Sequence, residues 1–203
     1  MPQIIDKIKF RLDKLLKKKM VIPDMVEKRK VIDNFIEIFQ PRYFIETGTF
    51  LGDTVEYFKN KFDVIYSIEL SEELANKAKV RFANDINVTI VHGDSSIKLK
   101  DMIVDLKEPI LFWLDGHYSS EFFIKDEYIK TAKGDTNTPI QLELDVILNS
   151  SVLPIILIDD ARLFTGKNDY PTLNAIKQQV NISGKNLDVF VNKDIIHIIP
   201  QKR

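Results

Sequence analysis

The chain has 203 residues, 44% hydrophobic and 29% charged, which predicts a globular chain with one main domain and excludes disordered, collagen-like and coiled-coil classes. The 29 basic and 30 acidic side chains give a net charge of −1, so no overall field favours a nucleic-acid partner. The absence of cysteine excludes disulfides, thiolate catalysis and cysteine-ligated metal sites.

The chain is predicted to begin with a helical extension over residues 1–40. In residues 4–20 apolar side chains recur at helical spacing among lysines and arginines, and residues 25–39 form a second helical stretch flanked by prolines. We expect the basic helix to pack on the rest of the protein, or to form a homodimer, and not to bind a membrane. Charge precedes any apolar run of signal-peptide length, and no apolar run reaches the roughly 18 residues that span a bilayer, which favours a cytoplasmic protein.

Residues 41–203 form the predicted main domain. Short apolar, β-branched runs alternate there with helical segments, as in βαβ units around a parallel sheet. The expected parallel strands are residues 43–46, 64–69, 88–92, 110–115 and 154–159, and the expected helices are residues 54–61, 72–84, 96–105 and 140–149. Residues 187–191 and 195–199 are separated by a short turn-forming link, which predicts an antiparallel hairpin.

Residues 118–139 follow a strand end and fit neither the helical nor the strand period. Long irregular segments in compact domains are usually functional loops. We therefore expect residues 119–138 to form a mobile lid over a bound acceptor.

Ligands of open parallel α/β sheets bind at the carboxyl ends of the strands. The first strand ends in Glu46 and continues into a turn that holds Gly48, Thr49 and Gly52, where glycine allows positive φ and close approach of a ligand. We expect these four residues to contact a cofactor. The alternative is that the glycines serve only the turn.

Acidic residues also follow the next two strands. Glu69 lies 23 residues beyond Glu46, close to the spacing at which an acid accepts hydrogen bonds from both ribose hydroxyls of an adenosine cofactor. Asp94 and Ser95 follow the third strand, from which an acid can reach an adenine amino group. In the alternative interpretation Glu69 is a surface or capping residue and Asp94 caps the next helix.

From residue 43 onward, these residues resemble the class I S-adenosylmethionine-dependent methyltransferases. The resemblance implies a Rossmann-like methyltransferase fold, with a mostly parallel seven-stranded sheet that closes in an antiparallel hairpin. It also implies that Glu46, Gly48 and Gly52 hold the methionine part of the cofactor, that Glu69 holds the ribose and that Asp94 holds the adenine. Phe50 stands where the family usually has its middle glycine. The dinucleotide fingerprint G-x-G-x-x-G is absent, which disfavours a nicotinamide cofactor.

The fourth strand end indicates which kind of acceptor to expect. It lacks the acid or asparagine, two prolines and aromatic residue typical of enzymes that methylate base amino groups. Residues 114–119, 131–135 and 158–162 instead resemble bacterial O-methyltransferases that act on sugars or related small hydroxyl compounds. The resemblance thus favours transfer of a methyl group to a hydroxyl.

Asp115, Asp159 and Asp160 follow two strands that we expect to be neighbours. Three carboxylates without a thiolate would select Mg²⁺, Mn²⁺ or Ca²⁺, and cation-dependent O-methyltransferases such as the catechol enzymes place their metal at these strand ends. In the alternative, Asp160 pairs with Arg162 and Asp159 caps a turn.

The expected catalytic residues are His117, Asp115 and Lys133. His117 is the first candidate for the general base, since an ordinary pKa of about 6.5 suits proton abstraction near neutrality, and Lys133 is its competitor. Asp115 is also predicted to contact the cofactor. Either base candidate could instead be an ordinary loop side chain. The remaining alternatives are a nucleotide-dependent oxidoreductase, a sugar-modifying enzyme and a non-catalytic Rossmann-like binding module.

Overall fold

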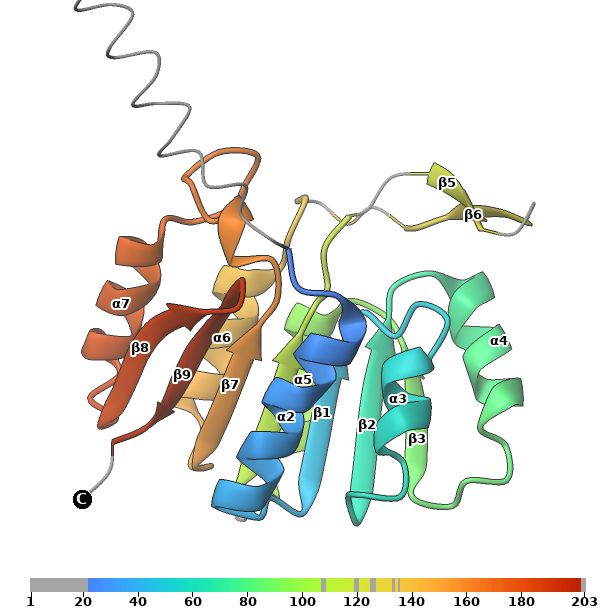
Figure 1. The fold of residues 1–203 in the computed structure, drawn as a ribbon, viewed down its shortest axis with the longest axis horizontal. Coiled ribbons are helices and arrows are strands. Elements are labelled where there is room, and N and C mark those ends of the chain that lie inside the picture. The colour runs from blue at the N-terminus through green and yellow to red at the C-terminus, as the bar shows by residue number, and fades with distance from the viewer. Residues whose placement is uncertain are drawn as a thin grey trace, which may run out of the picture.

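The computed structural model describes residues 22–106, 109–118, 121–124, 127–132, 134 and 136–201. Its centre is a seven-stranded sheet in the order β3-β2-β1-β4-β7-β9-β8 (Figure 1). Five strands are parallel, and they are β1 (Tyr43–Thr47), β2 (Val64–Glu69), β3 (Val88–His92), β4 (Ile110–Leu114) and β7 (Pro154–Ile158). Strands β8 (Leu187–Asn192) and β9 (Ile195–Pro200) form the predicted antiparallel hairpin.

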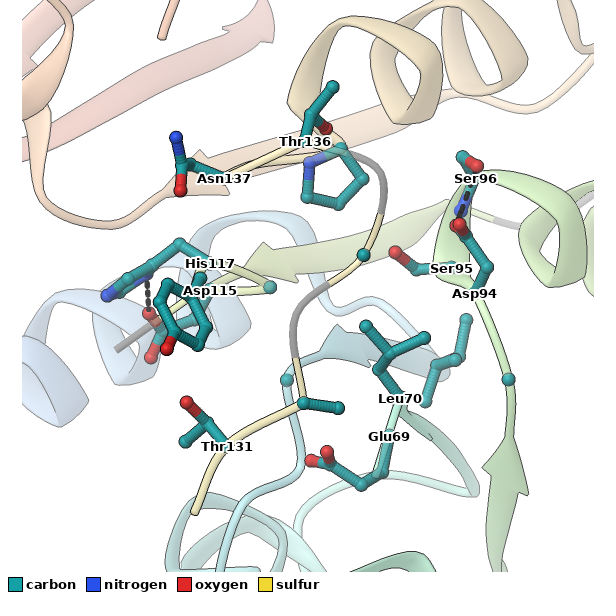
Figure 2. Close-up of a pocket in the computed structure, with 18 of the residues that line it drawn as sticks. Glu69, Leu70, Asp94, Ser95, Ser96, Asp115, His117, Thr131, Thr136 and Asn137 are labelled. Carbon is teal, nitrogen blue, oxygen red and sulfur yellow. Dashed lines mark hydrogen bonds and ion pairs between the residues drawn. The ribbon is translucent and has the colours of Figure 1, made fainter. Parts of the chain in front are cut away.

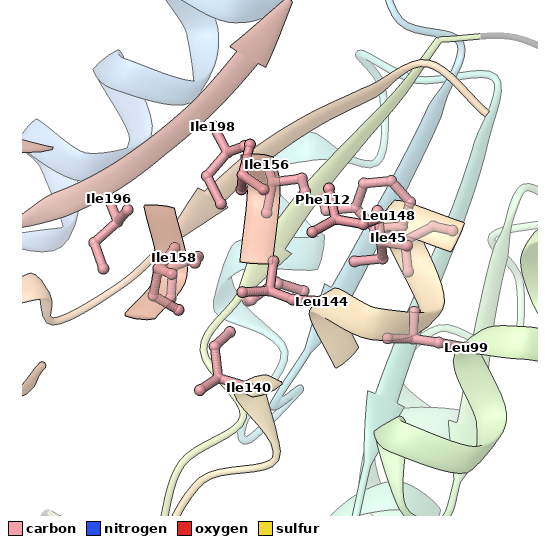
Figure 3. Close-up of a cluster of buried hydrophobic side chains, with 14 of the residues drawn as sticks. Ile45, Leu99, Phe112, Ile140, Leu144, Leu148, Ile156, Ile158, Ile196 and Ile198 are labelled. Carbon is pink, nitrogen blue, oxygen red and sulfur yellow. The ribbon is translucent and has the colours of Figure 1, made fainter. Parts of the chain in front are cut away.

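Helices cover both faces of the sheet because successive strand residues point to opposite sides. One face packs against α2 (Met25–Phe39), α3 (Asp53–Phe58) and α4 (Glu72–Arg81), and the other against α5 (Ser95–Ile103), α6 (Ile140–Asn149) and α7 (Leu173–Ile182). In β1, for example, Phe44 is buried in the core on the side of α2, α3 and α4, and Ile45 in the core on the side of α5, α6 and α7. Figure 3 shows the core on the α5, α6 and α7 side, in which Leu144 of α6 packs beside strand isoleucines. No described helix combines the length and the apolar character needed to cross a membrane.

Helix α2 is part of the core. Asp24 caps its N-terminus by accepting a hydrogen bond from the amide of Glu27, and Val31, Ile32 and Phe35 are buried against the sheet. Each such side chain stabilises the fold by about 1.5–3 kcal/mol relative to an exposed one. The boundary predicted at residue 40 stays a prediction, and the basic helix predicted over residues 4–20 lies outside the described residues.

The predicted elements differ from the structure mainly at their ends. Strands β4 and β7 stop one residue before Asp115 and Asp159, so both acids lie in loops. The sequence prediction missed α7, in which only Ile176 and Val180 are buried, too few to give a clear helical period. It also missed the short helix η1 (Ala161–Leu163).

The segment over residues 118–139 is not wholly irregular, which corrects the prediction. It contains a two-stranded antiparallel sheet, β5 (Glu121–Ile124) and β6 (Glu127–Lys130). Figure 1 places this hairpin above the edge at which the parallel strands end. Neither Glu-Phe-Phe-Ile nor Glu-Tyr-Ile-Lys alternates apolar and polar residues, so the period-2 signal of a strand is absent from both.

Candidate functional site

A cavity of about 480 Å³ opens at the carboxyl ends of the parallel strands (Figure 2). Its walls come from the loops that follow β1, β2, β3 and β4, and from the residues around β6 and the start of α6. The residues that line it include Gly48, Phe50, Glu69, Leu70, Leu74, Asp94, Ser95, Ile97, Asp115, His117, Asn137 and Leu142. Figure 2 shows Glu69 and Asp94 on one side of this space, and Asp115 with His117 on the other.

The turn after β1 brings the backbone close to the loop after β4. Gly48 has φ of 85°, and a Cβ atom there would lie 2.6 Å from the carbonyl oxygen of Asp115. Only glycine fits this approach. Phe50 also has a positive φ of 51°, so the phenylalanine keeps the left-handed backbone that glycine favours. Phe50 therefore keeps the backbone conformation that a glycine would adopt at this position of the turn.

Glu69 ends β2 and is held on both sides by backbone amides. Its Oε2 accepts a hydrogen bond from the amide of Phe50, and its Oε1 accepts one from the amide of Ser71, both at 2.8 Å. Burial raises the pKa of this carboxyl, and the hydrogen bonds from the backbone oppose the rise. Since each carboxylate oxygen has a second lone pair, Glu69 is fixed in place and can still accept hydroxyl hydrogens from a ligand.

Asp94 is the N-cap of α5, as the alternative interpretation expected. Its Oδ1 accepts hydrogen bonds from the amide and the hydroxyl of Ser96, at 2.8 and 2.6 Å. The residue also lines the cavity, so capping and ligand contact are compatible. Ser95 lines the cavity as well, and its Oγ donates to Oε1 of Glu143 at 2.5 Å.

Three of the predicted cofactor residues lie behind the cavity wall instead of lining it. Glu46 is only 1% exposed and accepts a hydrogen bond from Ser67 Oγ at 2.5 Å, while burial raises its pKa to about 8. The hydroxyls of Thr49 and Ser67 lie 2.6 Å apart. Gly52 precedes α3, and a Cβ atom there would lie 2.7 Å from the Phe82 ring. In the structure these residues support the turn.

The other end of the cavity holds a histidine between two acids. His117 Nδ1 lies 3.1 Å from Asp115 Oδ1, and its Nε2 lies 3.7 Å from Asp160 Oδ2. Burial lowers the pKa of His117, but the hydrogen bond to Asp115 and the negative charges of Asp115, Asp160 and Asp159 outweigh it and raise the pKa above its ordinary value. The imidazole is therefore more basic than a free histidine.

Asp159 and Asp160 lie behind His117 and do not line the cavity, and a lysine lies between them. Lys28 Nζ is 2.6 Å from Asp159 Oδ2 and 3.4 Å from Asp160 Oδ1. Arg162 Nη1 is 2.7 Å from Asp160 Oδ1 and also pairs with Asp194 in the turn between β8 and β9. The pair of Asp160 and Arg162 that the alternative interpretation expected is therefore present.

The metal site predicted at Asp115, Asp159 and Asp160 does not fit this arrangement. Protein cations already contact the two carboxylates after β7, and His117 contacts the carboxylate of Asp115. Within the described part of the chain, no three histidine, aspartate or glutamate side chains are grouped so that they could hold a metal ion. The sequence analysis did not anticipate that Lys28 lies against two of these carboxylates.

Sequence reasoning missed two residues that support the site, and both are ionisable residues on a buried helix face. Lys28 lies on the stripe of α2 that continues with Val31 and Ile32. Glu143 lies on the buried stripe of α6, is 1% exposed, and has its pKa raised to about 7 by burial. A charged residue at an apolar position of a helical stripe is the signal that could have found them. Lys133, the predicted second base, lies outside the described residues.

Comparison with known proteins shows the fold. No protein-family model and no curated protein sequence matches the chain. Among solved structures, an O-methyltransferase of Bacillus cereus in complex with S-adenosylhomocysteine superposes with a TM-score of 0.54 at 15% identity, over 88% of this chain and 83% of that one. A TehB-like methyltransferase of Corynebacterium glutamicum gives 0.53 at 15% identity over the whole of both chains. A Podospora anserina methyltransferase bound to S-adenosylhomocysteine gives 0.54 at 15% identity, over 83% and 76%. The predicted Rossmann-like fold of class I methyltransferases is thus confirmed.

Proposed function

We propose that this protein is an S-adenosylmethionine-dependent O-methyltransferase that acts on a hydroxyl of a sugar or another small molecule. The observation that carries the proposal is the continuous cavity that runs from Glu69 and Asp94 to the pair of His117 and Asp115. One end is suited to an adenosine, and the other to removal of a proton from an acceptor. The fold shared with solved methyltransferases supports the same interpretation.

The cofactor end fits an adenosyl group by both charge and shape. The fixed carboxylate of Glu69 would accept hydrogen bonds from the two ribose hydroxyls. Asp94 would accept one from the adenine amino group, between the apolar side chains of Leu74, Ile97 and Leu142 that line the same cavity. This is the arrangement of polar and apolar groups expected of a cofactor site.

The acceptor end provides the base. S-adenosylmethionine supplies a methyl group on a positively charged sulfur, which an acceptor oxygen can attack as the carbon–sulfur bond breaks. His117 would take the hydroxyl proton at Nε2, while Asp115 holds Nδ1 and stabilises the imidazolium that forms. Asp115, which lines the same cavity, would also place negative charge near the cationic sulfur of a bound cofactor. Lys133 stays the competing prediction for the base.

The acceptor identifies the activity, so the test searches for it directly. The purified protein would be incubated with a small-molecule cell extract and S-adenosylmethionine labelled in its methyl group, and the products analysed by mass spectrometry. We expect label on the oxygen of a hydroxyl compound, and no such product with His117→Gln. Label on a nitrogen, or no labelled small molecule although the wild type binds S-adenosylhomocysteine, would contradict the proposal.

A further inference from the structure

The ammonium of Lys28 is buried behind the acceptor end of the cavity, where its partner Asp160 lies beside the lining residue His117. The side chain of this α2 residue is 8% exposed, and its partner Asp159 lies 131 residues further along the chain. A buried ammonium is costly unless it is paired and hydrogen-bonded. Its contacts at 2.6 and 3.4 Å with Asp159 and Asp160 provide that pairing.

Three of the four oxygens of the two carboxylates accept hydrogen bonds from the protein. Asp159 uses Oδ1 to accept the amide hydrogen of Asp160 at 2.7 Å, and Oδ2 to accept from Lys28. Asp160 shares Oδ1 between Lys28 and Arg162, and turns Oδ2 toward His117 Nε2. Lys28 and Arg162 together bring two positive charges to this pair, the charge that one divalent ion would bring.

We propose that Lys28 is a positioning residue whose ammonium is the resident cation of the acceptor end, in the place where a divalent metal would otherwise bind. It keeps Asp159 and Asp160 from repelling each other, and so holds Asp160 against His117. The catalytic consequence, methyl transfer without a metal, rests on the proposed function. The exclusion of the metal does not, because it follows from the contacts of Lys28 alone.

The test measures binding of Mn²⁺ to the full chain by electron paramagnetic resonance at neutral pH. Lys28→Met keeps an unbranched stem and removes the charge, so it frees the carboxylates. We expect no binding by the wild type below millimolar Mn²⁺, and a gain in affinity of about tenfold or more in Lys28→Met. Lys28→Arg should behave as the wild type. The matched control is Lys30→Met, because Lys30 is an exposed lysine of the same helix.

Two results would overturn the inference. One is micromolar Mn²⁺ binding by the wild type, which needs no variant and decides the matter even if Lys28→Met does not fold. The other is a folded Lys28→Met that binds Mn²⁺ no better than the wild type. Calorimetry with S-adenosylhomocysteine, run on the same samples, separates the two proposals. Absent cofactor binding would count against the methyltransferase function, whereas the role of Lys28 would still be decided by the Mn²⁺ result.

Discussion

The two ends of the cavity are built in different ways. At the cofactor end, Glu69 and Asp94 are fixed by backbone amides of the turns beside them. At the acceptor end, the side chains are held by ion pairs between segments distant in sequence, from α2 to the loop after β7 and the turn between β8 and β9. The first end is held by hydrogen bonds from the turns of neighbouring strands, whereas the second is held by ion pairs that join α2 to the C-terminal part of the chain.

This difference has energetic consequences. A hydrogen bond to a charged group contributes about 1.5–3 kcal/mol, and each cofactor-end bond can be removed separately. Removing one partner of a buried ion pair costs about 3–5 kcal/mol, because the other charge stays buried. Substitutions at the cofactor end should therefore weaken ligand binding, and substitutions among the acceptor-end ion pairs should also lower stability.

The largest expected effect is on cofactor affinity. Glu69→Ala removes the acceptor of two ribose hydrogen bonds, each charge-assisted, so we expect a loss of about 3–6 kcal/mol, or roughly 10²- to 10⁴-fold in Kd for S-adenosylhomocysteine. Calorimetry measures it. Glu72→Ala, at an exposed acid of α4, is the matched control and should bind as the wild type does. Unchanged binding by Glu69→Ala would remove the distinction between the two ends.

The next effect separates chemistry from binding. His117→Gln should lower kcat by at least about 10²-fold, the usual contribution of a general base, and leave Kd for S-adenosylhomocysteine within about twofold. Turnover at saturating cofactor measures the first quantity. His92→Gln, at the histidine that ends β3, should retain kcat. If instead both variants turn over equally, His117 is not the base.

The pH profile tests the acceptor end in a second way. Because the pKa of His117 is raised and the base must be neutral, kcat should fall about tenfold per pH unit below a midpoint that lies above 6.5. Asp115→Asn removes a neighbouring negative charge and should move that midpoint to lower pH. The measurement is kcat from pH 5 to 9. A flat profile, or a midpoint below 6.5, is incompatible with this role.

The smallest effect concerns the support beneath the cofactor end. The folded chain keeps a proton on Glu46 up to a pKa of about 8, whereas the unfolded chain releases it near 4.5. The folded state therefore binds more protons between these values, and stability falls as pH rises through this window. Glu46→Gln removes that loss, so its Tm should fall clearly less than the wild type's between pH 5 and 8.

The control for this last comparison is Glu72→Gln, whose exposed side chain should leave the wild-type pH dependence intact. Equal slopes of Tm against pH for Glu46→Gln and the wild type would mean that Glu46 is already ionised in the folded protein.

The sequence predicted the parts of the molecule that depend on local pattern. Apolar runs predicted β2 and β3, and a helical segment predicted α6, with their bounds as observed. Acids at strand ends pointed to Glu69 and Asp94, which line the cavity. The same rule brought Asp159 and Asp160 to one edge but could not identify their cation. Which helix covers a strand end depends on tertiary packing, which a local sequence pattern does not show. Lys28 was therefore placed in the N-terminal extension, and its contacts with Asp159 and Asp160 were not predicted.

The positions behind the cavity wall show the same limit. Glu46 was predicted at the cofactor because it ends a strand, yet it faces Ser67 and is 1% exposed. A strand end specifies the edge of the sheet, whereas the contacts of Glu46 depend on strand pairing, which places it opposite Ser67 of β2. Glu143 lies on a helix and not at a strand end, and the residue that it contacts, Ser95, lies 48 positions earlier, so no local pattern indicated it.

The most direct measurement is a crystal structure of the wild-type protein with S-adenosylhomocysteine. We expect the adenosyl group in the cavity, its ribose hydroxyls within hydrogen-bond distance of Glu69, its adenine beside Asp94, and its sulfur directed toward Asp115 and His117. Ligand bound elsewhere, or the cavity without ligand in crystals soaked at saturating concentration, would contradict the assignment of this cavity to the cofactor.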